Sequence, residues 1–283
     1  MAMTVDEIVA LALQMSGLDE LPADSQVIVP GETVSRVAVG IELGLPDLML
    51  AKDLGYDGAI THHPHGSRAV LGIPEVATRH AMLMKRAGVP EETADRLAEE
   101  FAEQLAVTRH ASNYDVLAGP AQLVGLPLIG LHTPLDEIGR RRMQKRVDEV
   151  LEANPEAAVG DVVEGLYAFG EFRNAATKIE VRHGSAEAPA GRTFVCHAAG
   201  TNGGFAIAKA YFEAGVDTLI YIHVSPDDLR QIRAETEGTL IVTGHIASDS
   251  LGINPFLDAL RERGVESTNF GGIVPAVGPW KTG

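Results

Sequence analysis

The feature that most constrains this chain is an internal repeat. The first copy spans 51–63 and reads AKDLGYDGAITHH, and the second spans 208–223 and reads AKAYFEAGVDTLIYIH. Aligning the aspartates of the two copies, Asp57 and Asp217, also pairs the histidines at their ends. Self-similarity of this kind is typical of a fold built from two related parts.

A second pair of similar segments follows the first pair in the same order. Residues 132–139 read HTPLDEIG and residues 245–252 read HIASDSLG, so both have the form H-x-x-x-D-x-x-G. Each follows an apolar run and precedes a helical pattern. The two copies differ because the first contains an extra, mainly helical segment at about 75–121, which we expect on the surface of the first lobe.

Strand-like and helix-like patterns alternate along the chain, which indicates α/β architecture with mainly parallel sheets. The expected strands are 36–41, 58–61, 128–131, 193–197, 218–222 and 239–242. The expected helices are an amphipathic first helix within 1–15 and the segments 47–54, 75–87, 91–105, 139–153, 206–214, 226–235 and 255–263. Small residues and prolines gather at 154–161 and 183–191, so we predict two related α/β lobes, 1–155 and 156–283, that form one compact unit with a metal site between them.

Composition narrows the class of protein. The 283 residues carry a formal net charge of −16, which argues against nucleic acid or an anionic membrane as a partner. Glycines and prolines interrupt the most apolar stretch, 116–135, so it does not predict a membrane helix. Acidic residues near the N-terminus do not fit a secretory signal, and the single cysteine, Cys196, fits a reducing compartment. We therefore expect a cytoplasmic protein.

Two adjacent histidines, His62 and His63, stand where the strand 58–61 ends. Ligands of open parallel sheets gather at the carboxyl ends of the strands. In a regular strand the two side chains would point to opposite faces, whereas a bend of the backbone, favoured by Pro64, would let each serve one metal of a dinuclear centre.

The H-x-x-x-D elements add carboxylates to these histidines. His245 and Asp249 converge if their turn is helical, and His132 and Asp136 repeat that spacing. Three imidazoles (His62, His63, His245) and two carboxylates (Asp136, Asp249) form a ligand set suited to zinc, manganese, iron or nickel. Asp115, in RHASNYD, is an alternative to Asp136 because it also follows a histidine at short range.

In this order, THHPHG at 61–66, HTPLD at 132–136 and GHIASDSLG at 244–252 resemble the motifs of the Nif-three-like (NGG-one-interacting factor three) dinuclear metal-centre family. The similarity spans most of the chain. Two departures stand out: Asp249 replaces the usual glutamate, and the tryptophan-containing N-terminal signature is absent, since the only tryptophan is Trp280. The large domain that some members carry between the lobes is also missing from this sequence.

The resemblance implies that two divalent metal ions are bound by five residues, with the central aspartate as the bridge: His62, His63, Asp136, His245 and Asp249. It also implies metal-dependent hydrolysis, through a metal-bridging hydroxide, of an unknown small molecule such as a nucleotide or another heterocycle. The family is often labelled type 2 GTP cyclohydrolase I, but nothing in this sequence selects GTP. The family forms hexamers, so a homo-oligomer is expected. The alternative function is a non-catalytic metal-binding scaffold or regulator.

The remaining candidates are the counterparts of the ligands and one loop. His132 and His223 are candidates for proton transfer or for support of the ligands, with structural hydrogen bonding as the alternative. The glycine-rich sequence at 200–204 precedes a helix, and Thr201 and Asn202 within it are candidate pocket residues. The apolar surroundings of Cys196 favour an inert thiol over a nucleophile.

Overall fold

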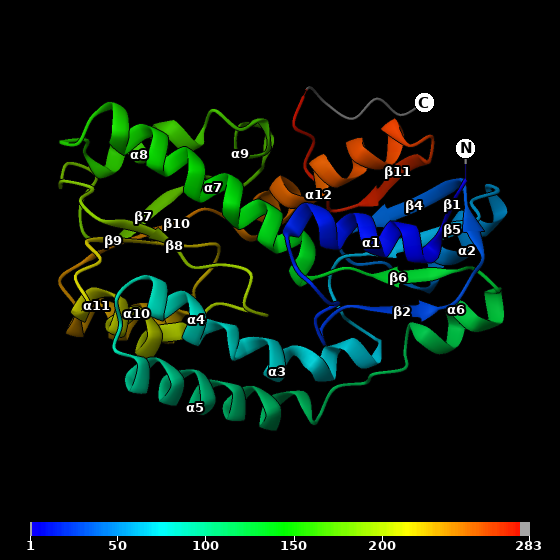
Figure 1. Ribbon diagram of the computed structural model, residues 1–283, viewed down its shortest axis with the longest axis horizontal. Helices are drawn as coiled ribbons and strands as arrows, with labels where there is room; N and C mark the ends of the chain where they lie inside the picture. The colour runs from blue at the N-terminus through cyan, green and yellow to red at the C-terminus, as the bar shows by residue number, and fades with distance from the viewer. Residues whose placement is uncertain (1, 278–283) are drawn as a thin grey trace. The chain divides into compact units, whose positions relative to one another are not determined.

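The computed structural model describes residues 2–277, and the chain forms two compact units that are each made of several segments (Figure 1). Unit 1 comprises 2–76, 104–138 and 252–273, and unit 2 comprises 77–103, 139–251 and 274–277. Trp280 lies outside the described residues. The mixed α/β class with mainly parallel sheets is confirmed, whereas the lobe boundary at residues 155 and 156 stays a prediction.

Unit 1 is built on a five-stranded sheet in the order β11-β4-β5-β6-β2. Its strands are β2 (Gln26–Val29), β4 (Arg36–Gly40), β5 (Gly58–Thr61), β6 (Leu128–Gly130) and β11 (Glu266–Gly271). All neighbouring pairs are parallel except β2, which runs antiparallel to β6 at one edge. A separate two-stranded sheet pairs β1 (Met3–Thr4) with β3 (Thr33–Val34).

Unit 2 is built on a four-stranded sheet in the order β7-β10-β9-β8. Its strands are β7 (Glu180–His183), β8 (Thr193–Val195), β9 (Thr218–Tyr221) and β10 (Thr239–Val242). The last three are parallel, and β7 pairs antiparallel with β10. The series β8, β9, β10 and β7 therefore has the same order and directions as β4, β5, β6 and β2, as two related lobes require.

The aligned aspartates of the repeat, Asp57 and Asp217, make equivalent hydrogen bonds in the two sheets. The Asp57 carboxylate accepts the backbone N–H groups of Ser35 (3.0 Å) and Arg36 (2.8 Å), at the start of β4. The Asp217 carboxylate accepts the N–H of Arg192 (2.7 Å), directly before β8. Each aspartate thus ties the beginning of one strand to the beginning of its neighbour.

The helices cover both faces of each sheet. They are α1 (Val5–Ser16), α2 (Leu45–Asp53), α3 (Ile73–Ala77), α4 (Arg79–Arg86), α5 (Glu91–Arg109), α6 (Ala118–Val124), α7 (Thr133–Ala153), α8 (Val159–Leu166), α9 (Gly170–Asn174), α10 (Gly204–Glu213), α11 (Pro226–Glu235) and α12 (His245–Glu262), with a short 3-10 helix at Arg68–Gly72. None of the described helices is long and apolar enough to cross a membrane.

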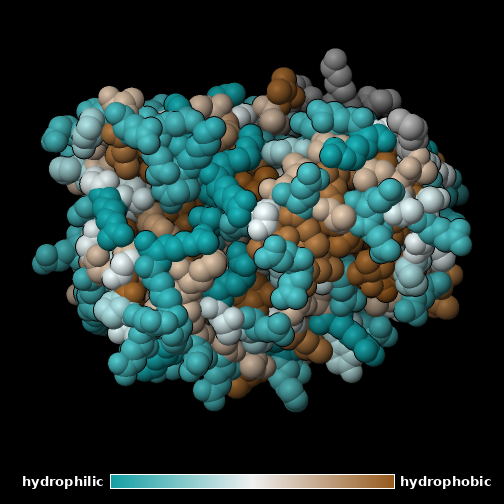
Figure 2. Space-filling view, viewed as in Figure 1, coloured by the Kyte–Doolittle hydropathy of each residue, from teal (hydrophilic) through white to brown (hydrophobic). Residues whose placement is uncertain are grey.

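Alternation along the strands divides the core of unit 1 into two layers. Val37 and Val39 pack with α1 and α12, whereas Ala38 between them packs with α2 and α6. In unit 2, Leu219 faces α4, α5, α10 and α11, and its neighbour Ile220 faces α7, α8 and α9. Figure 2 shows the hydrophilic outer side chains over α7, which buries its apolar residues in the second of these layers.

Several elements differ from their predicted bounds. The helices α7 and α12 begin earlier, so that both H-x-x-x-D elements lie at helix starts rather than before them. Pro134 is compatible with this because the first turn of a helix needs no N–H at that position. The predicted helix 75–87 is divided into α3 and α4, and α4 with most of α5 packs in the core of unit 2.

Candidate functional site

In unit 1, His62 and His63 extend the sheet beyond the end of β5. Their backbone N–H groups donate to Gly40 O (3.0 Å) and Ile41 O (2.8 Å) on the β4 side. Despite being adjacent in sequence, their rings lie with centroids 5.2 Å apart. The His62 ring is buried and the His63 ring is nearly so. Both imidazoles are therefore available to one site at the carboxyl edge of this sheet.

The His62 ring is oriented by a backbone carbonyl. Its Nδ1 lies 2.9 Å from Leu131 O, which can only accept, so Nδ1 carries a proton and the neutral ring has its lone pair on Nε2. That Nε2 lies 3.2 Å from Asp136 Oδ1, and both side chains are buried. Two electron-pair donors that face each other at this distance, away from bulk water, fit the coordination shell of a cation.

His132 is oriented in the same way by a buried carboxylate. Its Nδ1 lies 2.7 Å from Asp24 Oδ2, and its Nε2 lies 3.6 Å from Asp136 Oδ2. Asp24 also accepts the Thr133 hydroxyl (2.7 Å), while Ser25 Oγ accepts the His132 N–H (2.9 Å). A carboxylate behind a histidine is a common arrangement at metal sites, so His132 has the geometry of a ligand as well as of a proton-transfer group.

His63 completes this group. Its Nδ1 lies 3.0 Å from the Glu42 carboxylate, which again leaves Nε2 as the nitrogen for a ligand role. One ring nitrogen from each of His62, His63 and His132 lies within 4.8 Å of the other two. Unit 1 alone therefore holds three histidines whose ring nitrogens could share a metal ion, and Asp136 lies against two of them, His62 and His132.

In unit 2, the second H-x-x-x-D element begins helix α12. The N–H of Ser248 donates to Gly244 O (3.1 Å), which starts the helix, and Gly244 has a φ of 96° that favours glycine. One helical turn then brings His245 Nε2 to 3.4 Å from Asp249 Oδ2. Asp249 is buried. The 3.4 Å contact shows that its side chain, although shorter than that of glutamate, reaches the histidine.

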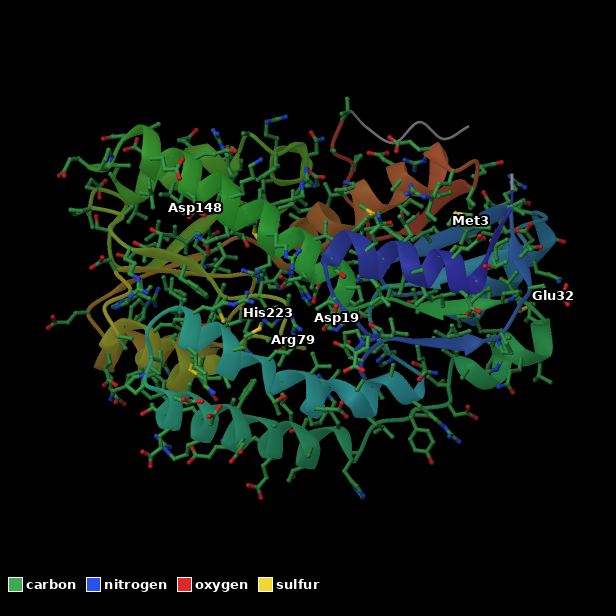
Figure 3. The ribbon with its side chains drawn as sticks, viewed as in Figure 1. Met3, Asp19, Glu32, Arg79, Asp148 and His223 are labelled. Atoms are coloured by element: carbon green, nitrogen blue, oxygen red, sulfur yellow. The ribbon has the colours of Figure 1, made fainter. Side chains whose placement is uncertain are left out.

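His223 lies beside this pair, on the loop after β9 (Figure 3), with its ring centroid 4.6 Å from that of His245. The Asn202 side-chain nitrogen lies 2.6 Å from His223 Nδ1 and also donates to the backbone carbonyl of His223. Two candidates that are far apart in sequence, Asn202 and His223, are thus in direct contact.

Thr201 is linked to a buried histidine through its backbone. The Thr201 carbonyl lies 3.0 Å from His80 Nε2, and His80 Nδ1 lies 3.7 Å from Cys196 Sγ. Burial lowers the pKa of His80 to about 4, although the bond to Thr201 opposes this. Burial also raises the pKa of Cys196 to about 12, so the thiol stays protonated, as the inert role requires. A role for the Thr201 side chain stays a prediction.

The loop that holds Thr201 has an unusual backbone. Ala198 has a φ of 64° and is the one non-glycine residue with positive φ in 2–277. Its carbonyl accepts a hydrogen bond from Arg79 Nε (3.0 Å), a residue labelled in Figure 3. A left-handed alanine costs free energy, and this contact helps to hold the turn.

Two residues of the unit 1 group, Asp24 and Glu42, are not indicated by any sequence motif, and the alternative carboxylate Asp115 lies elsewhere. Asp24 lies two residues before the start of β2, and no motif marks it. Glu42 follows the end of β4, so the rule that placed His62 at a strand end could have found it. Asp115 is exposed in the loop before α6, whereas Asp136 is buried against His62 and His132. The geometry of unit 1 therefore favours Asp136 over Asp115.

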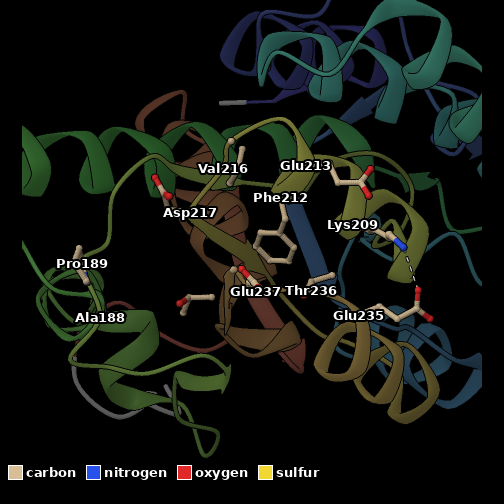
Figure 4. A pocket seen from close by; sticks show the side chains of 13 residues that line it. Ala188, Pro189, Lys209, Phe212, Glu213, Val216, Asp217, Glu235, Thr236 and Glu237 are labelled. Atoms are coloured by element: carbon tan, nitrogen blue, oxygen red, sulfur yellow. Dashed lines mark hydrogen bonds and ion pairs between the residues drawn. The ribbon is translucent and has the colours of Figure 1, made fainter.

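A pocket of about 470 Å³ lies at the opposite, amino edge of the unit 2 sheet (Figure 4). Phe212, Asp217 and Glu237 line it, together with the ion pair between Lys209 and Glu235 (3.1 Å). None of the candidate residues of the site contributes to this pocket. Parallel sheets bind ligands at the other edge, so we do not assign the site here.

Comparisons with known proteins identify the family. The chain is 44% identical to a NIF3 superfamily protein from Sphaerobacter thermophilus, with a TM-score of 0.92 over 96% of this chain and 100% of that one. Reduced HcgD from Methanocaldococcus jannaschii (10% identity, TM-score 0.57, 95% and 98% covered) shares the fold. So does the Staphylococcus aureus hypothetical protein SA1388 (12%, 0.53, 94% and 96%). No protein-family model and no curated protein matches. On its identity to the Sphaerobacter protein, and with the motif order that the sequence already showed, this chain belongs to the NIF3 superfamily.

Proposed function

We propose that this protein binds two divalent metal ions and is a metal-dependent hydrolase. The proposed ligands are His62, His63, Asp136, His245 and Asp249. The mixed imidazole and carboxylate set suits zinc, manganese, iron or nickel. The substrate is a small molecule, with a nucleotide or another heterocycle as the class that the family resemblance suggests.

The observation that carries the proposal is the buried contact between His62 Nε2 and Asp136 Oδ1 at 3.2 Å. Because the Nδ1 of His62 donates to Leu131 O, the neutral form of this ring turns an acceptor, Nε2, toward the carboxylate. When His62 is neutral with its proton on Nδ1, the lone pair of Nε2 and the carboxylate oxygen face each other without a proton between them. A cation between them would stabilise both, which supports a metal at this point.

When bound, two divalent ions at such a site lower the pKa of a water and polarise the bond to be hydrolysed. The chain supplies the orientation of the ligands. Asp24 keeps the proton of His132 on Nδ1, and Glu42 does the same for His63. His132 thereby becomes a further ligand candidate, while proton transfer by His132 or His223 stays a prediction.

Metal quantification combined with an unbiased substrate screen tests the proposal. The wild type, expressed in metal-supplemented medium, should contain two ions per chain and hydrolyse one class of compound. His63→Ala should lose metal and turnover while remaining folded by circular dichroism. His110→Ala is the matched control, because His110 is an exposed histidine after α5. Fewer than one ion per chain in the wild type would contradict the dinuclear centre.

The same screen separates catalysis from a scaffold role. A protein with two bound ions but no hydrolysed compound, whose assembly changes when a chelator is added, would be a metal-binding scaffold. A homo-oligomer, a hexamer by resemblance, is part of the proposal, as is a cytoplasmic location. Helix α2 supports self-association, because four large apolar side chains on the helix and at its C-terminal end are exposed: Leu45, Met49, Leu50 and Leu54. Light scattering with and without chelator measures the oligomer.

A further inference from the structure

The hydrogen bonds of Asn202 fix the protonation of His223. The side-chain nitrogen of Asn202 donates to the backbone carbonyl of His223, which can only accept. This contact determines which end of the amide faces His223. The same nitrogen lies 2.6 Å from His223 Nδ1, so its second hydrogen points at that ring atom. Nδ1 of His223 is therefore an acceptor without a proton.

A neutral imidazole has one N–H, which in His223 must be on Nε2. This is the reverse of His62, whose Nδ1 faces a carbonyl and whose Nε2 is the acceptor. The reversal distinguishes two roles, because a metal ligand needs a lone pair at the nitrogen that meets the metal, and a hydrogen-bond donor needs a proton there. His223 has the form of a donor.

We infer that His223 donates a hydrogen bond from Nε2 to an anionic oxygen of the substrate, a phosphoryl or carboxylate oxygen, and that Asn202 is the positioning residue that makes it a donor. The inference rests on the proposed function, since His223 lies 4.6 Å, between ring centroids, from the proposed ligand His245. His223 is only partly buried, whereas Asn202 behind it is 9% exposed. Donors held in place before the substrate arrives stabilise negative charge without having to reorient.

The protonation can be measured without metal or substrate. Solid-state ¹⁵N NMR of the full-length apo protein, labelled at histidine and prepared at pH 8, gives different shifts for protonated and unprotonated ring nitrogens. The difference spectrum between the wild type and His223→Gln isolates His223. A protonated Nε2 and an unprotonated Nδ1 are expected, and the opposite assignment would overturn the inference.

Inorganic phosphate is the probe for the donor role. Calorimetry on the metal-loaded protein should show 10–100-fold weaker phosphate binding for His223→Phe, about the effect of losing one hydrogen bond to a charged group. His223→Gln should stay close to the wild type, because a glutamine amide nitrogen can occupy the place of Nε2. Asn202→Asp should weaken binding as His223→Phe does, because a carboxylate accepts from Nδ1 and moves the proton off Nε2. Asn154→Asp is the matched control on an exposed turn.

Each result bears on one of the two proposals. Unchanged phosphate affinity in His223→Phe, or in Asn202→Asp with the proton of Nε2 shown to have moved, would overturn the donor role. Equal loss in His223→Gln and His223→Phe would overturn it as well, because only bulk or packing would then explain the effect. If the wild-type protein bound no metal, the proposed function would be contradicted instead. The NMR experiment would then still test the hydrogen-bonding arrangement of Asn202 and His223.

Discussion

The sheets of the two units share an order of strands but differ in what stands behind their histidines. After β5, His62 and His63 each present Nδ1 to an oxygen that accepts. After β9, the equivalent of β5 in the second sheet, His223 presents Nδ1 to an amide that donates. The same residue type at the same place in the same framework thus acquires opposite hydrogen-bonding capacity. In the roles that we propose, one changed neighbour divides the histidines of a duplicated scaffold between metal binding and substrate contact.

The largest expected effect tests the ligand side of this comparison. Asp136→Ala should lower metal affinity more than about 100-fold, beyond what loss of a supporting residue costs. It removes the carboxylate that faces both His62 and His132. Asp115→Ala, in the same unit but exposed, should bind metal as the wild type does. Metal titration by calorimetry measures both, and a larger loss in Asp115→Ala would reverse the assignment of the central carboxylate.

The next effect concerns the residue behind His132. Asp24→Asn should lower metal affinity by about 10–100-fold, because the amide holds the proton of His132 on Nδ1 less strongly and lacks the negative charge. Asp19→Asn, an exposed change in the same segment, is the control. Unchanged affinity in Asp24→Asn would show that the orientation of His132 does not depend on its carboxylate.

A third prediction separates the two units by their response to acid. His80, in unit 2, has its pKa lowered by burial from 6.5 to about 4. Between pH 6.5 and about pH 4, His80 is therefore protonated in the unfolded chain but neutral in the folded protein. The free energy of unfolding falls as the pH falls through this range. Between pH 7 and pH 5 this histidine should cost about 2 kcal/mol of unfolding free energy.

Urea denaturation at several pH values measures the effect. His80→Gln should be less stable than the wild type at pH 7 but should lose less stability on going to pH 5. Hydrogen exchange should show that the acid-sensitive amides lie around α4 and the loop 196–204. If the free energy of unfolding changed equally with pH in the wild type and the variant, His80 would not be the neutral buried group described here.

The smallest effects concern the paired aspartates at the other edge of the sheets. Asp57 accepts two backbone N–H groups and the Ser35 hydroxyl, whereas Asp217 accepts one N–H. Asp57→Ala should therefore lower the free energy of unfolding by about 2 kcal/mol and Asp217→Ala by about 1 kcal/mol. Urea denaturation at constant pH compares the two, and a larger effect at Asp217 would contradict the count of hydrogen bonds.

Much of the central framework is predictable from the sequence because its strands are buried on both sides. The apolar runs at β4, β5, β9 and β10 have no polar face to obscure them, and their predicted bounds differ from the observed ones by at most one residue. The edge strands β2 and β7 do not stand out in the sequence because they are antiparallel and partly exposed, although they are as long as β5 and β9. The joining of β11 to β4 depends on contacts between distant parts of the chain, which no local pattern encodes.

The candidate site shows the same division. Spacing predicts that His245 and Asp249 converge, because one helical turn brings them together. Spacing does not predict Asp24 behind His132, or Asn202 against His223, because these pairs come from separate loops. Residue type and position therefore indicate which side chains gather, while the proton on each ring depends on a partner that only the fold supplies.

The paired aspartates have a consequence for engineering. Asp57 and Asp217 hold the beginnings of the strands, and the loop 196–204, with Asn202, lies beyond the end of β8. The groups that secure the sheet and the groups of the proposed ligand site thus occupy opposite ends of the same strands. A library that varies positions on the ligand side, such as 201 and 202, can sample new specificities while the starts of all these strands remain tied together.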